Sequence, residues 1–384
     1  MSKGGFGFER AMIKLALQTV VVAIAVGVLV WLFTEIFESN DPHESYKAET
    51  PAERPPIKNG IAEAQALAKI GPVEFWRKEF PKGDFDRMTV DPAGIVTAVD
   101  FGIVQALEQP IFQPVSEARG SVSKKEPVIS IVFNNDPRAY PLRTLMWHEV
   151  VNDTVGGVPV AVTYCPFCDS GIVFDRRLGD ELLDFGVTGK LRASNLIIYD
   201  RETESWWQQF TGEAISGAHA GKRLIMLPAR MESVASFQAR HPDGQLLIPS
   251  DRGSNPYGRN PYPKYDSRTG PFTTYYDGPY HPAVPPMARV VAVGNKAWSL
   301  AYLRQRGRLE EGDLAITWEP GRLSALDHLF VSQGRDVGIV AVERRTENGL
   351  VSIPFQLTFA FVYYAFNPLG TLIGTPDQAD AKWE

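Results

Sequence analysis

The chain has two cysteines, in the segment Cys165-Pro-Phe-Cys168, and a His148-Glu149 pair precedes them. A tight turn of this kind aims two sulfurs at one point, which suits zinc or copper(I) held by thiolates. Two sulfurs are half of a metal site. We predict His148 as the third ligand, from candidates that comprise His148, Glu149, Asp169 and His219.

The same spacing also suits a dithiol redox pair, in which neighbouring groups lower the pKa of one thiol. Thioredoxin-like enzymes place the first cysteine at the start of a helix, whereas Ile172-Val173-Phe174 has the composition of a strand. A third interpretation is a plain disulfide or structural metal knuckle, with His148 a buried histidine. The domain is then a non-catalytic ligand- or partner-binding module. The sequence leaves all three interpretations open.

The residues before the cysteines are expected to position the site. If residues 144–153 are helical, His148 and Asn152 lie one turn apart on the same face, and Asn152 can orient the imidazole. Glu149 is then a candidate acid or base. Asp169 directly follows the second cysteine and is a candidate neighbour of the metal ligands.

Several familiar catalytic motifs do not match. The segment His148-Glu-Val-Val-Asn152 has Asn where the zinc proteases have their second His. Zinc deaminases require H-x-E and P-C-x-x-C, but here His and Glu are adjacent and Tyr164 precedes the first cysteine. The chain has no G-x-S-x-G elbow for a hydrolase and no phosphate-binding loop with its lysine.

From Gly94 onward the pattern consists of short β-like runs separated by turn signals such as Asn134-Asn135-Asp136-Pro137. This spacing predicts a mainly β, α+β domain, with an antiparallel sandwich or barrel-like core, short helices and long loops. The expected strands are 95–99, 128–133, 158–164, 171–174, 182–187, 196–199, 224–227, 290–293, 314–318 and 355–364.

Short helices are expected at residues 61–70, 73–80, 232–240 and 299–306. Residues 251–286, rich in Pro, Gly and Tyr, predict an ordered loop that covers part of the domain. Within this loop Tyr257, Arg259, Tyr262 and Tyr265 can line a pocket, with Arg259 as an anion anchor, although such loops more often serve as surface cover. Trp206 and Trp207 are expected in the core.

The N-terminus predicts a membrane anchor. Residues 1–11 are short and basic, and the segment 12–33 contains 19 almost wholly apolar residues, about the length that crosses a ~30 Å bilayer core. The charge pattern places residues 1–11 in the cytoplasm and the rest in the periplasm or another extracytoplasmic space. The alternative, a cleaved signal peptide, lacks a cleavage site after Phe33. A polar, Pro-rich linker at 34–60, a single globular domain at 61–370 and a tail at 371–384 follow.

The composition is that of an ordinary globular protein, with 44% hydrophobic and 22% charged residues. The net charge of −6 and the lack of a Lys/Arg-dense block argue against a nucleic-acid partner. A small molecule or a redox protein remains the expected kind of partner, and neither is identified by the sequence.

The chain also resembles a bacterial and archaeal family, domain of unknown function 3179, over residues 90–365. The resemblance rests on ordered segments that include Trp147-His-Glu-Val-Val-Asn-Asp-Thr154, Pro159-Val-Ala-Val-Thr-Tyr-Cys-Pro-Phe-Cys168, Leu191-Arg-Ala-Ser-Asn195 and Tyr257-Gly-Arg-Asn-Pro-Tyr262. It implies that the His-Glu pair and the two cysteines belong to one module, and it names no activity. Members of the family often carry Gly where this chain has Asp169.

Overall fold

The computed structural model describes residues 72–118, 122–249 and 255–374, which all belong to one compact unit, Ile70–Glu384. The predicted anchor at 12–33, the linker at 34–60, the helix at 61–70 and most of the tail lie outside the described residues. Within the described part of the chain, no helix has the length and apolar character needed to cross a membrane.

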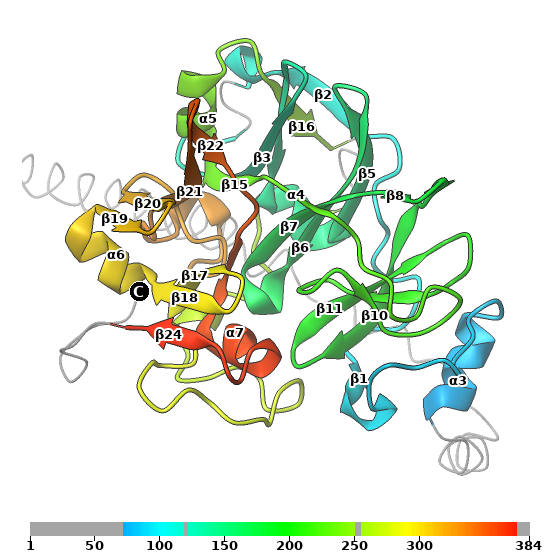
Figure 1. Cartoon of the computed structure of the whole chain (residues 1–384). Coiled ribbons are helices and arrows are strands. Elements are labelled where there is room, and N and C mark those ends of the chain that lie inside the picture. Colours follow the sequence, from blue (N-terminus) through cyan, green and yellow to red (C-terminus); the bar gives the residue numbers. More distant parts are fainter. Residues whose placement is uncertain (1–71, 119–121, 250–254, 375–384) are drawn as a thin grey trace, which may run out of the picture. The chain divides into compact units, whose positions relative to one another are not determined.

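The mainly β prediction is confirmed, because the described residues form short strands in small sheets with five short α-helices between them (Figure 1). Helices this short are not stable alone and depend on packing of their buried residues. The helices are α3 (Pro72–Glu79), α4 (Leu142–His148), α5 (Val234–Arg240), α6 (Leu300–Arg306) and α7 (Ala360–Phe366), with 3-10 turns η1 (Pro92–Gly94), η2 (Val115–Glu117), η3 (Pro166–Cys168), η4 (Tyr265–Ser267) and η5 (Val331–Gln333).

The sheet that carries the cysteines, which we call the cysteine sheet, is antiparallel and has the strand order β14-β7-β6-β5. Its central strands are nearly continuous apolar runs because both faces are covered, and Val160, Ala161 and Val162 are fully buried. The strands are β5 (Val150–Val155), β6 (Val158–Cys165), β7 (Ser170–Asp175) and β14 (Met226–Leu227).

Two five-stranded sheets and a two-stranded ribbon complete the first half of the fold. In one of them the predicted core residues Trp206 and Trp207 are fully buried on β12. The strands of that sheet, in order, are β1 (Ile95–Thr97), β10 (Phe185–Arg192), β11 (Asn195–Asp200), β12 (Trp206–Gln208) and β13 (Glu213–Ala214). The other sheet has β15 (Arg230–Ser233), β3 (Pro127–Phe133), β4 (Asp136–Pro141), β16 (Gln245–Ile248) and β2 (Ile111–Pro114), and the ribbon has β8 (Arg177–Leu178) and β9 (Glu181–Leu182).

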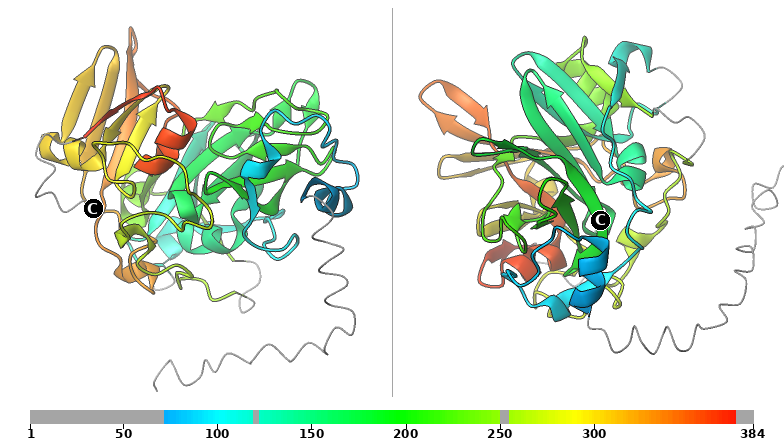
Figure 2. Two further views of the ribbon diagram at one scale, coloured as in Figure 1. Left: turned by 90° about the horizontal axis from the view of Figure 1, so that it is seen from below. Right: turned by 90° about the vertical axis from the view of Figure 1, so that its right-hand side faces the viewer.

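Two four-stranded sheets follow in the C-terminal half, and Figure 2 shows the orange strands of the second standing apart from the green strands of the earlier sheets. The first has the order β23 (Gln356–Phe359), β17 (Arg289–Val293), β18 (Lys296–Ser299) and β24 (Thr371–Ile373). The second has the order β19 (Arg308–Glu311), β20 (Leu314–Glu319), β21 (Ile339–Thr346) and β22 (Gly349–Ser352).

The sheets form a ring of blade-like units rather than the predicted sandwich or barrel-like core. The cysteine sheet contacts neighbouring sheets through β5, which adjoins β4, and through β7, which adjoins β23. Elsewhere in the ring β15 adjoins β21, and α6 contacts both C-terminal sheets. Short strands at regular spacing are compatible with several all-β architectures, so the sequence pattern does not select among them.

Two predicted elements are corrected. Residues 355–364 are not one strand, because β23 ends at Phe359 and α7 begins at Ala360. Residues 144–153 are not one helix, because α4 ends at His148 and β5 begins at Val150. In both cases burial on all sides removes the polar face that normally distinguishes a helix from a strand.

Candidate functional site

The two cysteines lie in the tight connection between β6 and β7. Cys165 is the last residue of β6 and pairs with Ser170 at the start of β7, while Cys168 ends the turn η3. Asp169 then adopts a left-handed conformation with φ 47° and ψ 41°. Glycine adopts this conformation without strain, which gives a physical reason for the Gly expected here in relatives.

The two sulfurs lie 3.0 Å apart, and both cysteines are almost completely inaccessible to solvent. Each thiol faces the carbonyl oxygen of Ser194, at 3.7 Å from Cys165 and 3.3 Å from Cys168, and the side-chain amide of Asn195 donates to Cys168 at 3.4 Å. Burial, and then the hydrogen bond with Cys165, raise the pKa of Cys168 well above its usual value. The pair is therefore an enclosed dithiol in which burial favours the neutral thiol of Cys168.

The carbonyl that faces the sulfurs comes from a two-residue hairpin between β10 and β11. Ala193 and Ser194 both have positive φ, 49° and 63°, as a type I′ turn requires. Neither residue is the Asn or Gly that usually signals such a turn, so this neighbour was missed as a site residue. The segment Leu191–Asn195 belongs to the family resemblance, and that was the signal that could have drawn attention to it.

The geometry of the pair differs from that of metal-bound thiolates. Two sulfurs bound to tetrahedral zinc at about 2.3 Å are about 3.8 Å from each other, farther apart than the sulfurs found here. Among the residues that the structure describes, no three His, Cys, Asp or Glu side chains form a group that could hold a metal ion. The predicted set of Cys165, Cys168 and His148 is thus not assembled as a metal centre in this part of the chain.

Both ring nitrogens of His148 have other partners. Nδ1 lies 2.7 Å from the Gln105 carbonyl oxygen, and Nε2 lies 2.6 Å from the Tyr257 hydroxyl. Since a carbonyl only accepts, Nδ1 carries the proton and Nε2 accepts from Tyr257. His148 is buried at the end of α4 and matches the satisfied histidine of the third interpretation.

Asn152 does not orient His148, because it lies on β5 rather than on a helix. Its side-chain amide donates to the Phe185 carbonyl at 2.8 Å and accepts from the Phe185 N–H at 3.0 Å. It also approaches Glu108 at 3.2 Å. Asn152 therefore joins the cysteine sheet to β10. In the fourth ligand candidate, His219, Nε2 lies 3.2 Å from a carboxylate oxygen of Glu181, and the ring packs on Trp207.

Glu149 links the end of α4 to the strand that leads to the cysteines. It has φ 57° and ψ −27°, its N–H donates to Leu145, and its carbonyl accepts the N–H of Tyr164 at 2.8 Å. Glu149 as a whole residue is partly exposed, yet burial of its carboxyl raises the pKa of that group to about 8. No described residue forms a hydrogen bond or ion pair with that carboxyl. Left-handed backbone and a perturbed acid are features of functional sites.

The loop predicted to cover the domain lies over the cysteine turn. The Tyr265 hydroxyl donates to the Phe167 carbonyl at 3.1 Å, and the ring of Tyr262 lies 4.6 Å from that of Phe167. Burial, followed by the charge of Glu149, raises the pKa of Tyr262, which places its phenol near that carboxyl. The backbone of Arg259 forms a β-bridge with Phe330, and its role as an anion anchor stays a prediction.

Asp169 belongs to a buried network of charged side chains. Its carboxylate accepts from Arg289 at 2.6 Å and from the Tyr164 hydroxyl at 3.0 Å. Arg289 also donates to Asp266 at 2.9 Å. Burial alone would raise the pKa of Asp266, but Arg289 and then Arg335 lower it to about 2. This network and a 3.0 Å bond from Thr358 to the Cys168 carbonyl fix the turn to the C-terminal sheets.

The comparisons with known proteins identify a family and no activity. Residues 103–370, well over half of the chain, match the family described as protein of unknown function, DUF3179. No curated protein and no solved structure matches. The site must therefore be interpreted from its own geometry.

Proposed function

We propose that in the DUF3179 family, to which this chain belongs, Cys165 and Cys168 form a dithiol–disulfide couple. The observation that carries the proposal is the 3.0 Å separation of the two sulfurs, together with their shared enclosure. The sulfurs of a disulfide are about 2 Å apart, so on oxidation the two sulfurs must move about 1 Å closer within the existing turn.

The chemistry balances as a thiol–disulfide exchange. Two S–H bonds break, one S–S bond forms, and the two protons and two electrons pass to a disulfide acceptor that leaves as two thiols. Glu149 is the proposed acid or base of the site. Its carboxyl has a pKa of about 8, and its backbone pairs with Tyr164, the residue before Cys165.

The proposed location is the outer side of a cytoplasmic membrane, to which residues 12–33 would anchor the domain. Support comes from the apolar length of that segment and the charges that precede it. An oxidising compartment also favours disulfide formation. In intact spheroplasts, added protease should degrade the domain, and full protection of the domain would contradict this location.

The couple can be tested with the full chain, since both of its cysteines are in the turn. After equilibration with glutathione buffers of graded potential, denatured protein should show two free thiols when reduced and none when oxidised. Peptide mapping should find the Cys165–Cys168 bond. The single variants Cys165→Ser and Cys168→Ser are matched controls, because each can form at most a mixed disulfide with glutathione and should never give the Cys165–Cys168 bond. Two thiols that stay free at every potential would overturn the proposal.

A second candidate is a thiophilic metal, zinc or copper, because the two sulfurs and the Ser194 carbonyl oxygen converge on one point. Metal analysis of protein purified without chelator distinguishes the two candidates. One equivalent of metal that disappears in the double serine variant would replace the dithiol proposal with the metal one. Metal-free protein with an oxidisable pair supports the dithiol.

A further inference from the structure

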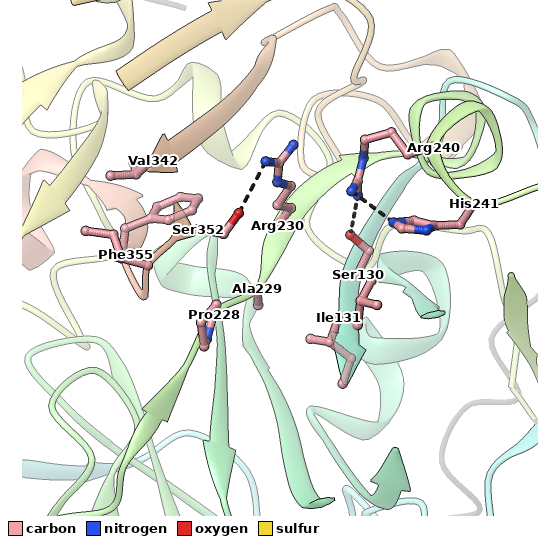
Figure 3. A pocket seen from close by; sticks show the side chains of 12 residues that line it. Ser130, Ile131, Pro228, Ala229, Arg230, Arg240, His241, Val342, Ser352 and Phe355 are labelled. Atoms are coloured by element: carbon pink, nitrogen blue, oxygen red, sulfur yellow. Dashed lines mark hydrogen bonds between the residues drawn. The ribbon is translucent and has the colours of Figure 1, made fainter. Parts of the chain in front are cut away.

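A hollow of about 250 Å³ lies away from the cysteine turn, where the sheet of β3 and β15 meets the sheet of β21 and β22 (Figure 3). Its floor and sides are mainly apolar, and its polar groups come from the start of β15, the end of α5, β3 and β22. The lining residues are Ser130, Ile131, Val132, Pro228, Ala229, Arg230, Arg240, His241, Val342, Ser352, Ile353 and Phe355.

Arg230 has N–H groups that could donate hydrogen bonds to a ligand. Its Nη2 makes long contacts with Glu343, at 3.2 Å, and with Ser352, at 3.4 Å. Its Nε and Nη1 have no hydrogen-bond partner among the described residues, and the side chain retains 24% exposure. Nε–H and Nη1–H point to different sides of the guanidinium, so each can donate one charge-assisted hydrogen bond to a carboxylate.

A second donor comes from His241. Arg240 donates to His241 Nε2 at 3.0 Å, so the imidazole proton is on Nδ1. Burial and then Arg240 lower the pKa of His241, which keeps the ring neutral. Arg240 itself is occupied, because its remaining N–H groups bind Glu232 and Ser130.

The polar groups that line the hollow are mainly hydrogen-bond donors. Both arginines have acidic partners, but Glu232 is fully buried and neither it nor Glu343 lines the hollow. The lining thus presents basic and hydroxyl groups without a carboxylate. Opposite them, Ile131, Val342 and Phe355 offer an apolar surface.

From this arrangement we propose that the hollow binds a small aliphatic carboxylic acid. The carboxylate pairs with Arg230 and receives the Nδ1–H of His241, and the hydrocarbon chain packs on the apolar side. The site is independent of the cysteine couple, since it shares no residue with the turn.

The test is titration calorimetry of the full chain with acetate, butyrate, hexanoate and octanoate. Each methylene that enters the apolar part should lower the dissociation constant about fourfold, until the hollow is full. Hexanol, which has the chain without the charge, and inorganic phosphate, which has charge without the chain, should both bind at least tenfold more weakly than hexanoate. Equal binding of phosphate and hexanoate would overturn the aliphatic assignment.

Two variants and one control test whether the ligand binds in the hollow. Arg230→Gln should weaken hexanoate at least tenfold. Arg344→Gln removes the same charge from an exposed position on β21, the strand that carries Val342, and should leave the affinity for hexanoate unchanged; Arg344 pairs with Asp313. Ala229→Leu fills the hollow without changing charge and should abolish binding. If Ala229→Leu or Arg230→Gln binds hexanoate like the parent chain, or if no acid in the series binds, the proposal is wrong.

Discussion

Replacement of Glu149 by Gln should stabilise the protein, and the gain should grow with pH. Burial raises the pKa of this carboxyl from 4.5 to about 8. Between those values the unfolded chain releases the proton while the native state keeps it. The native state then binds more protons, so the free energy of unfolding falls as pH rises. Gln keeps the size of the side chain and removes the ionisation.

The magnitude follows from the two pKa values. Complete ionisation of the carboxyl costs about 5 kcal/mol at pH 9 and above. The same linkage gives about 3 kcal/mol at pH 7 and about 1 kcal/mol at pH 5. Water that reaches the partly exposed side chain reduces each figure, so these are upper values.

Urea unfolding of parent and Glu149→Gln proteins at pH 5, 7 and 9 measures the difference. Glu310→Gln is a control of opposite sign, because hydrogen bonds from Arg308 and Arg345 lower the pKa of Glu310. That variant should be less stable than the parent by a nearly constant amount at all three pH values, because the stability that a carboxyl with a lowered pKa supplies is lost only when pH falls below its unfolded pKa. A difference between Glu149→Gln and parent that is the same at all three pH values would refute the inference that Glu149 is a buried acid.

Three further predictions concern the same region. Glu149→Gly should be more stable than Glu149→Ala by about 1 kcal/mol, because glycine accepts the left-handed backbone, and equal unfolding midpoints would contradict this. Asp169→Asn should lower the free energy of unfolding in denaturant by about 3 kcal/mol, because buried Arg289 loses a charged partner. A loss below about 0.5 kcal/mol would show that Asp266 alone is enough to balance the charge of Arg289. Tyr257→Phe removes the hydroxyl that hydrogen-bonds to His148 Nε2, so it should lower the free energy of unfolding by about 1 kcal/mol and shift the ¹⁵N resonance of that nitrogen. An unchanged resonance would disprove the hydrogen bond.

The strands around the site could be predicted from sequence because their local signals agree. The apolar run at 158–164 ends at a proline-containing turn, and the run at 128–133 ends at Asn134-Asn135. The structure places β6 and β3 at those positions with shifts of one residue. An ordered covering loop at residues 251–286 was also predicted, since so many aromatic residues in a loop need a surface to pack on, but the surface that it covers was not.

The partners of the site residues could not be predicted, because they come from distant parts of the chain. His148 meets Gln105 and Tyr257, which are 43 and 109 residues away. The end of α4 was missed for a local reason. A left-handed residue after a helix is usually Gly or Asn, whereas here it is Glu149, so the sequence carries no stop signal. Once α4 ends there, Asn152 belongs to a strand and faces Phe185.

The redox and metal interpretations of the cysteine pair require different sulfur separations. A disulfide needs the sulfurs to approach from 3.0 Å to about 2 Å, whereas zinc needs them to separate to about 3.8 Å. The two changes are similar in size, about 1.0 Å and about 0.8 Å, so thiol titration and metal analysis must decide between them. Thr358 binds the Cys168 carbonyl, and Arg289 holds Asp169 beside it. In either case the movement therefore falls mainly to Cys165, at the end of its strand. Asp169→Asn loosens only the Cys168 side of the turn, so it should leave the disulfide able to form.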